Sequence, residues 1–216
     1  MPARFNRPLR AGHARRGDPV AYMHVMVTSS RLVVEILAAR VEHVHADALL
    51  LPVDGTICRL GGAASGALRA ALPPDERADE MAYLEDELAR LRPLPHARAR
   101  AIDGVARWKT IIVSAAYPHN VDGIVHSPDD CARLLRAAIP PAVALAAERG
   151  LASIAATLIG TAYRMSVDQA IRAFADALAA AAQHRIRVCW SLPDSTHRER
   201  AEVACRQRGL VTCAST

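Results

Sequence analysis

The sequence of 216 residues contains one lysine, no closely spaced cysteine pair and no long apolar run. Lys109 is the sole lysine among 27 basic residues, so the formal charge of +5 comes almost entirely from arginine. Together with abundant alanine, this bias is typical of a GC-rich genome and is weak support for contacts to phosphate backbones. We therefore expect no nucleic acid partner.

The five cysteines lie far apart and form no C-x-x-C motif, which excludes the usual zinc and disulfide frameworks. No apolar run reaches the roughly 18–20 residues that span a bilayer, and the first residues lack the apolar segment of a signal peptide. The composition, 51% hydrophobic, suits one well-buried core. These features predict a cytoplasmic protein without a membrane, metal or cofactor partner.

Residues 1–28 differ in composition from the rest of the chain. They are rich in arginine, proline and glycine and show no hydrophobic period, so we expect a disordered basic tail before a domain over 29–216. The tail reads equally as a basic arm, as a transit-like segment, or as an upstream extension if translation begins at Met23 or Met26.

From Arg31 onward, short apolar runs alternate with longer amphipathic segments. This order predicts an α/β domain with helices on both faces of a sheet. The predicted strands cover residues 31–38, 47–53, 97–102, 109–117, 151–160 and 185–192. The predicted helices cover residues 65–72, 75–91, 127–150, 166–183 and 195–209, the third interrupted or kinked at Pro140 and Pro141.

Two predicted strands are followed by glycine-bearing loops. The first ends at Asp54 and leads to Gly61 and Gly62, and the second leads to Gly160. Ligands of open α/β sheets bind at the carboxyl ends of the strands, and a glycine pair before a helix lets an anion approach backbone N–H groups. Ser65, at the predicted helix start, is most simply an N-cap.

Three segments in order resemble the macro domain family, the α/β/α modules known for binding ADP-ribose. They are ADALLLPVDGTICRLGGAASGAL, ARARAIDGVARWKTIIVSAAYP and GLASIAATLIGTAYRMSV, and the resemblance covers residues 31–209. It implies a three-layer α/β/α fold with a mixed, mostly parallel sheet, and a nucleotide-like ligand. The implied ligand-binding residues are Asp54, Gly61, Gly62, Ser65, Gly160, Thr161, Ala162, Tyr163 and Arg164.

The sequence departs from the family pattern at functional positions. Arg40 stands near the place of an acidic residue that contacts adenine, although a one-residue slip substitutes a neighbour, and Asp54 replaces an asparagine that contacts the distal ribose. The second phosphate loop carries Ala162, Tyr163, Arg164 and Met165 where glycines are usual. These departures favour binding over hydrolysis.

Several of the candidate residues also have purely structural explanations. Asp54 and Gly55 also suit an ordinary turn in which the carboxylate bonds its own backbone. Arg164 either meets a phosphate or lies in solvent. His43 and His45 have the spacing of metal ligands but no evident third ligand, and Ser114, His119 and Asp122 lack the G-x-S-x-G context of a catalytic triad.

Three functional hypotheses follow. The first is a module that binds ADP-ribose or a related nucleotide without turnover. The second is an ADP-ribosyl hydrolase in which Asp54 positions or activates a water. The third is a scaffold whose ancestral pocket has decayed. The sequence leaves the oligomeric state open.

Overall fold

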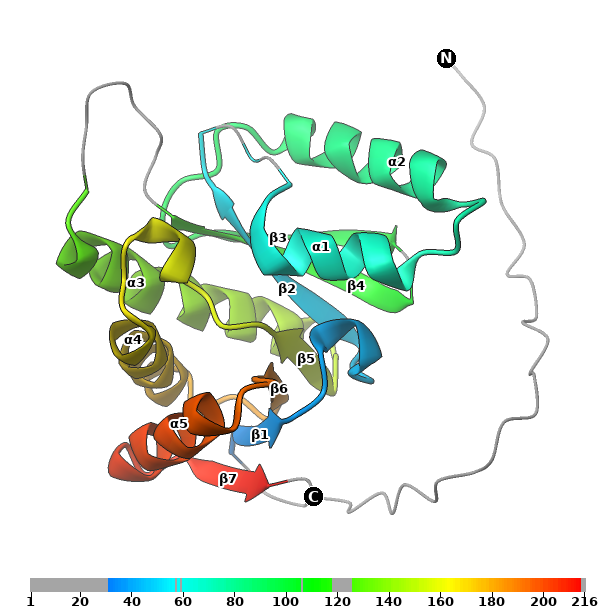
Figure 1. Cartoon of the computed structure of the whole chain (residues 1–216). Coiled ribbons are helices and arrows are strands. Elements are labelled where there is room, and N and C mark those ends of the chain that lie inside the picture. The colour runs from blue at the N-terminus through cyan, green and yellow to red at the C-terminus, as the bar shows by residue number, and fades with distance from the viewer. Residues whose placement is uncertain (1–30, 57, 59, 106, 118–125, 215–216) are drawn as a thin grey trace, which may run out of the picture.

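The computed structural model describes residues 31–56, 58, 60–105, 107–117 and 126–214, so the predicted basic tail lies outside the described residues. The described chain forms a seven-stranded sheet between two layers of helices (Figure 1). This arrangement confirms the predicted three-layer α/β/α fold.

The sheet is mixed and mostly parallel, as predicted. Its strand order is β3-β4-β2-β5-β6-β1-β7, and β3 pairs antiparallel with β4 while every other pairing among the described strands is parallel. The strands are β1 (Val33–Leu37), β2 (Ala48–Asp54), β3 (Ala99–Val105), β4 (Trp108–Tyr117), β5 (Ser153–Ala156), β6 (Arg187–Ser191) and β7 (Val211–Ala214).

Helices cover both faces of the sheet. In Figure 1, α1 (Gly62–Ala71) and α2 (Arg77–Arg90) lie on one side, and α3 (Pro128–Glu148), α4 (Val167–Ala180) and α5 (Ser195–Gln207) lie on the other. Two short 3₁₀ helices, η1 (Val41–His43) and η2 (Thr161–Tyr163), complete the described elements. Each side has its own hydrophobic cluster, because alternate residues of the buried strands point to opposite faces.

Local signals explain where the helices begin and end. The Ser127 side chain accepts a hydrogen bond from the amide of Asp130 at the start of α3, and Ser166 forms a capping box with Gln169 at the start of α4. Gly150, with φ +71°, follows the end of α3 and supplies the left-handed residue expected there.

The structure corrects or refines three details of the prediction. Of the two outcomes predicted at Pro140 and Pro141, an interruption or a kink, the interruption does not occur: α3 is one helix, and the flanking residues Ile139 and Ala142 are fully buried in the core. The fifth predicted strand is shorter, since only Ser153–Ala156 pairs with neighbours. The edge strand β7 was not predicted, and its four residues pair only with β1.

Candidate functional site

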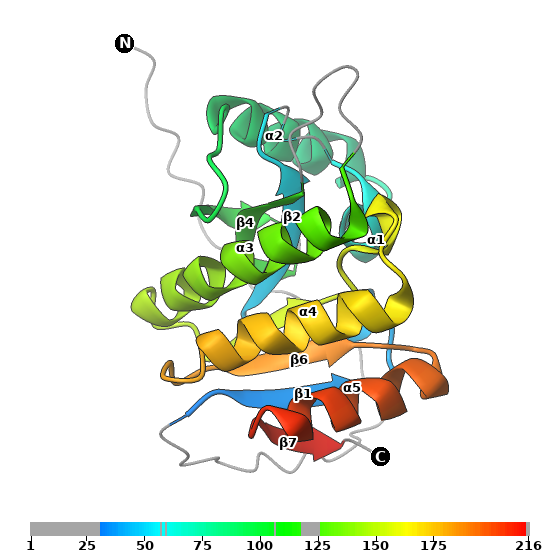
Figure 2. The same ribbon diagram turned by 90° about the vertical axis from the view of Figure 1, so that its left-hand side faces the viewer.

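The two glycine-bearing loops leave the sheet at the same edge. The strands β2 and β5 are parallel neighbours, so the first loop (residues 55–61) and the second loop (residues 157–166) both begin at carboxyl ends. Figure 2 shows the arrowheads of β1 and β6 pointing toward this edge as well. The edge is therefore the place where a parallel α/β sheet offers a ligand crevice.

The first loop begins with a tight turn at Asp54. This side chain is 6% exposed, and its Oδ1 accepts a hydrogen bond of 2.7 Å from the amide of Thr56. The amide of Cys58 donates to the carbonyl of Asp54, and the amide of Leu94 donates to the carbonyl of Gly55. Asp54 and Gly55 thus form the simple turn that the sequence also allowed, in which the carboxylate bonds its own backbone. These bonds fix the direction of the carboxylate.

The loop ends at an open helix start. Gly61 is the N-cap of α1, with φ −161° and no side-chain cap, and the first turn contains no acidic residue. A Cβ atom at Gly61 or at Gly62 would meet no heavy atom within 4 Å among the described residues. Gly61, Gly62 and Ala63 are exposed at this helix start, where the helix dipole adds a partial positive charge.

Ser65 does not cap the helix, contrary to the prediction. The helix begins three residues earlier, at Gly62, so Ser65 lies inside it and is 5% exposed. Its Oγ donates a hydrogen bond of 2.9 Å to the carbonyl of Gly61. This bond engages the hydroxyl of Ser65 with the carbonyl of Gly61 and not with an amide of the first turn.

The second loop turns sharply at Gly160. Its φ of +112° is a conformation that side chains rarely adopt, and a Cβ atom there would collide with Cε of Met165. Thr161, Ala162 and Arg164 are exposed beyond this turn, whereas the side chain of Tyr163 lies outside the described part of the structure. Met165, 5% exposed, fills the space beneath the loop.

Each loop also contains a strained residue. Cys58 has φ +42° and Arg164 has φ +63°, and they are two of the three non-glycine residues with positive φ in the described chain. Such a conformation costs about 1–2 kcal/mol for a residue with a side chain. Strained backbone of this kind gathers at ligand-binding loops more often than elsewhere.

Cys58 itself is structural. It is 1% exposed, and its Sγ donates a weak hydrogen bond to the carbonyl of Gly55. Burial raises the pKa of this thiol, which keeps it protonated and unreactive at neutral pH. Cys58 was not identified from the sequence, and Met165 was noted there only as a large residue of the second loop, because only the structure shows that both are buried beside the loops.

The other candidate chemistries find less support. Ser114 is fully buried and donates to the carbonyl of Ala138, so its hydroxyl is not free to act as a nucleophile. The remaining members of that triad, His119 and Asp122, lie outside the described residues. Within the described residues, no group of three or more His, Cys, Asp or Glu side chains could hold a metal ion.

Residues 40–45, which precede β2, do not belong to a strand. His43 closes η1 and His45 is exposed, with Nδ1 3.1 Å from Nη2 of Arg107. Arg40 is 74% exposed and pairs through Nε with Oε1 of Glu42 at 2.8 Å. Both histidines are thus off the sheet, so the shared strand face that the metal hypothesis requires does not exist.

Known structures share this architecture. A macrodomain of Oceanobacillus iheyensis with MES bound aligns with a TM-score of 0.61 at 17% identity, over 82% of this chain and 90% of that one. A mutant of the same protein with ADPR aligns with a TM-score of 0.60 at 17% identity, over 82% and 91%. The chain has the macrodomain fold.

A further macrodomain structure agrees. The Trypanosoma brucei macrodomain in complex with ADP aligns with a TM-score of 0.56 at 17% identity, over 81% of this chain and 69% of that one. No protein-family model matches the chain, and a search of curated proteins found no match. Identities near 17% show the macrodomain fold without identifying a ligand, so the roles of Asp54 and the loop residues stay predictions.

None of the described helices is both long and apolar enough to cross a bilayer.

Proposed function

We propose that this macrodomain-fold protein binds ADP-ribose, or a closely related nucleotide, at the edge formed by the first and second loops. The observation that carries the proposal is the exposed start of α1, where the N-cap Gly61 provides no side-chain cap and a Cβ atom at Gly61 or Gly62 would meet no described heavy atom within 4 Å. Such a helix start suits a phosphate, because unpaired donors and the helix dipole both favour negative charge. Structural neighbours with ADPR or ADP bound support the same ligand class.

The second loop supplies the other wall of this proposed site. The hydroxyl of Thr161 and the guanidinium of Arg164 belong to exposed residues beyond Gly160. An arginine beside a diphosphate forms charge-assisted hydrogen bonds, which are stronger than bonds between neutral groups. In our proposal Asp54, Gly61, Gly62, Ser65, Gly160, Thr161, Ala162, Tyr163 and Arg164 surround the ligand.

Asp54 determines which part of the ligand lies at the end of β2. A carboxylate repels phosphate oxygens but accepts hydrogen bonds from hydroxyl groups. The ribose hydroxyls therefore lie at Asp54, and the phosphates lie at the start of α1. This polarity gives the ligand one direction in the site.

The protein binds its ligand without turnover in this proposal. A general base must be within hydrogen-bond reach of the water that it activates. Oδ1 of Asp54 already accepts the amide of Thr56, and in this proposal the remaining acceptor sites of the carboxylate take the ribose hydroxyls, so Asp54 orients the ligand and does not activate a water. The free thiols of all five cysteines support a cytoplasmic setting.

A calorimetric titration of the whole protein with ADP-ribose tests the binding. We expect saturable one-to-one binding, with weaker binding of adenosine, which lacks phosphates. Incubation with an ADP-ribosylated protein tests turnover and should release no ADP-ribose. Release that is lost in Asp54→Ala would establish the hydrolase instead, and absence of binding to any adenine nucleotide would establish the decayed scaffold.

A further inference from the structure

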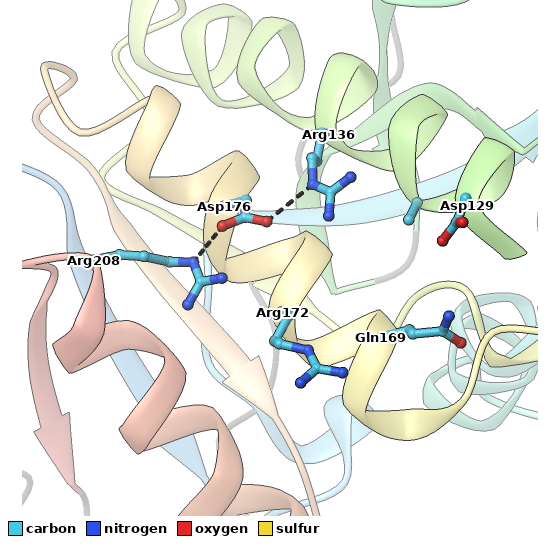
Figure 3. A pocket seen from close by; sticks show the side chains of 7 residues that line it. Asp129, Arg136, Gln169, Arg172, Asp176 and Arg208 are labelled. Carbon is cyan, nitrogen blue, oxygen red and sulfur yellow. Dashed lines mark hydrogen bonds and ion pairs between the residues drawn. The ribbon is translucent and has the colours of Figure 1, made fainter.

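A second hollow lies on the outer surface of the layer formed by α3, α4 and α5 (Figure 3). Its volume is about 370 Å³, which is within the range of small-molecule sites. It shares no residue with the first or second loop. Its polar lining consists of Arg136, Arg172, Arg208, Asp176, Asp129 and Gln169.

Asp176 holds two of the three arginines in place. Its Oδ2 accepts a bond of 2.9 Å from Nε of Arg136, and its Oδ1 accepts a bond of 2.5 Å from Nε of Arg208. Burial alone would raise the pKa of Asp176, but the hydrogen bonds from Arg208 and Arg136 outweigh it and hold that pKa below its usual value. The carboxylate is therefore ionised at neutral pH. Both arginines keep Nη donors that it does not use, and of these Nη1 of Arg208 donates to the carbonyl of Ala204.

Arg172 differs from its two neighbours. It lies one helical turn before Asp176 on α4 and is exposed. It forms no hydrogen bond or ion pair with any residue in the described part of the chain, and Figure 3 shows no dashed line to its guanidinium. Its charge therefore has no counter-ion within the described protein.

The net charge of the hollow is small and positive. Three arginines and two aspartates line it. Asp129 lies in the first turn of α3, where it complements the helix dipole, and Figure 3 places it across the hollow from Arg208. The part of the hollow that is lined by the arginines therefore attracts an anion. An anion with one negative charge neutralises the excess positive charge of the hollow.

We propose that this hollow binds a small monocarboxylate, with the carboxylate at Arg172 and the Nη groups of Arg136 and Arg208 beside it. The planar fork of a guanidinium matches the two oxygens of a carboxylate. A phosphate dianion carries two negative charges, whereas the hollow has one excess positive charge, and the ionised Asp176 repels the second. Binding here is independent of the nucleotide site, because no residue is shared.

The test is a titration of the whole protein with sodium L-lactate, followed by the ¹H–¹⁵N resonances of the arginine Nε groups. The resonances of Arg136, Arg172 and Arg208 should shift together and saturate, with a dissociation constant of about 1–10 mM for a small polar ligand. In Arg172→Gln the affinity at the other two arginines should fall at least about tenfold, the effect expected when a charge-assisted bond is lost.

Arg133→Gln is the matched control, because Arg133 is an exposed arginine of α3 that pairs with Asp130 outside the hollow. This variant should bind L-lactate as the wild type does. The proposal is overturned if sodium chloride at equal ionic strength produces the same shifts. It is also overturned if Arg172→Gln retains full affinity, or if inorganic phosphate binds more tightly than L-lactate.

Discussion

The glycines of the two loops have different structural roles, although the sequence presents them alike. Gly160 and Gly62 have positive φ values, and Gly160 also faces Met165, so both positions require glycine for the backbone itself. Gly61 has an extended backbone that any residue can adopt, and a Cβ atom there meets open space. Gly61 is therefore the position at which a side chain obstructs a ligand without disturbing the fold.

Gly61→Val should abolish the proposed ADP-ribose binding while the free energy of unfolding changes by less than about 1 kcal/mol, because the new side chain enters empty space. Calorimetry and urea unfolding measure the two effects separately. Gly66→Val, on an exposed part of α1 beyond its first turn, is the control, and it should keep its affinity without losing helix stability, because valine is a better helix former than glycine and a Cβ atom there meets no described heavy atom within 4 Å. Unchanged affinity in Gly61→Val would remove the ligand from the start of α1.

Arg164 combines backbone strain with a proposed ligand contact. Arg164→Gly relieves the left-handed conformation, so the free energy of unfolding should stay unchanged or rise by up to about 1 kcal/mol. The same substitution should weaken binding of ADP-ribose, and the loss should shrink as ionic strength increases. Thermal unfolding and titrations at two salt concentrations measure both. A variant that loses stability and keeps its affinity would contradict the assignment of Arg164 to the site.

At the scale of single residues, the sequence predicted the turn at Asp54 and the glycine-bearing loops, because Asp and Gly favour turn conformations of the backbone. It could not predict the packing of Cys58 and Met165 beneath the loops, although it noted Met165 as a large residue of the second loop. It also misplaced Ser65, since a serine that bonds the carbonyl four residues earlier looks in sequence like an N-cap.

At the scale of elements, the opposite edge of the sheet is held together by Asp47. Its Oδ1 accepts a bond of 2.6 Å from Nζ of Lys109, and its Oδ2 accepts a bond of 2.8 Å from the amide of Ala152. Its own amide donates to Oγ of Ser153. One side chain thus connects the beginnings of β2, β4 and β5 at the edge away from the proposed nucleotide site.

Burial alone would raise the pKa of Asp47, but the hydrogen bonds from Lys109 and from the amide of Ala152 hold it below the usual 3.8. Because the folded-state pKa is lowered, its contribution is complete well above pH 3.8 and is lost as the pH falls through the folded-state value. Asp47→Asn should therefore lower the free energy of unfolding by about 1 kcal/mol at neutral pH, since Lys109 is largely exposed and screened.

Urea unfolding, followed by the fluorescence of the two buried tryptophans, measures this effect. The difference between wild type and Asp47→Asn should shrink below pH 3.8, and affinity for ADP-ribose at neutral pH should not change. A difference that grows on acidification would contradict the role of the ionised carboxylate.

The elements themselves were largely predictable, because buried strands such as β2 are continuously apolar and the helices α3 and α4 begin at serine caps. The ends of β5 and the presence of β7 were not. Both depend on where a neighbouring strand offers hydrogen-bond partners, and short apolar runs carry no signal of that.

At the scale of the whole molecule, the described residues of both hydrophobic clusters lie between Leu32 and Leu210. Removal of residues 1–28 should therefore leave the melting temperature and the affinity for ADP-ribose unchanged. Differential scanning calorimetry and titration of the shortened chain measure this. A drop of several degrees would show that the amino-terminal residues belong to the domain, against the predicted boundary.

For the molecule as a whole, we propose that a nucleotide binds at the carboxyl edge of the sheet, between the loops that follow β2 and β5. The most direct measurement is the ¹H–¹⁵N spectrum of the backbone amides during titration with ADP-ribose. The claim predicts saturable shifts concentrated at the amides of residues 61–65 and 160–164. Shifts concentrated on α3, α4 and α5, or no shifts at saturating ADP-ribose, would contradict it.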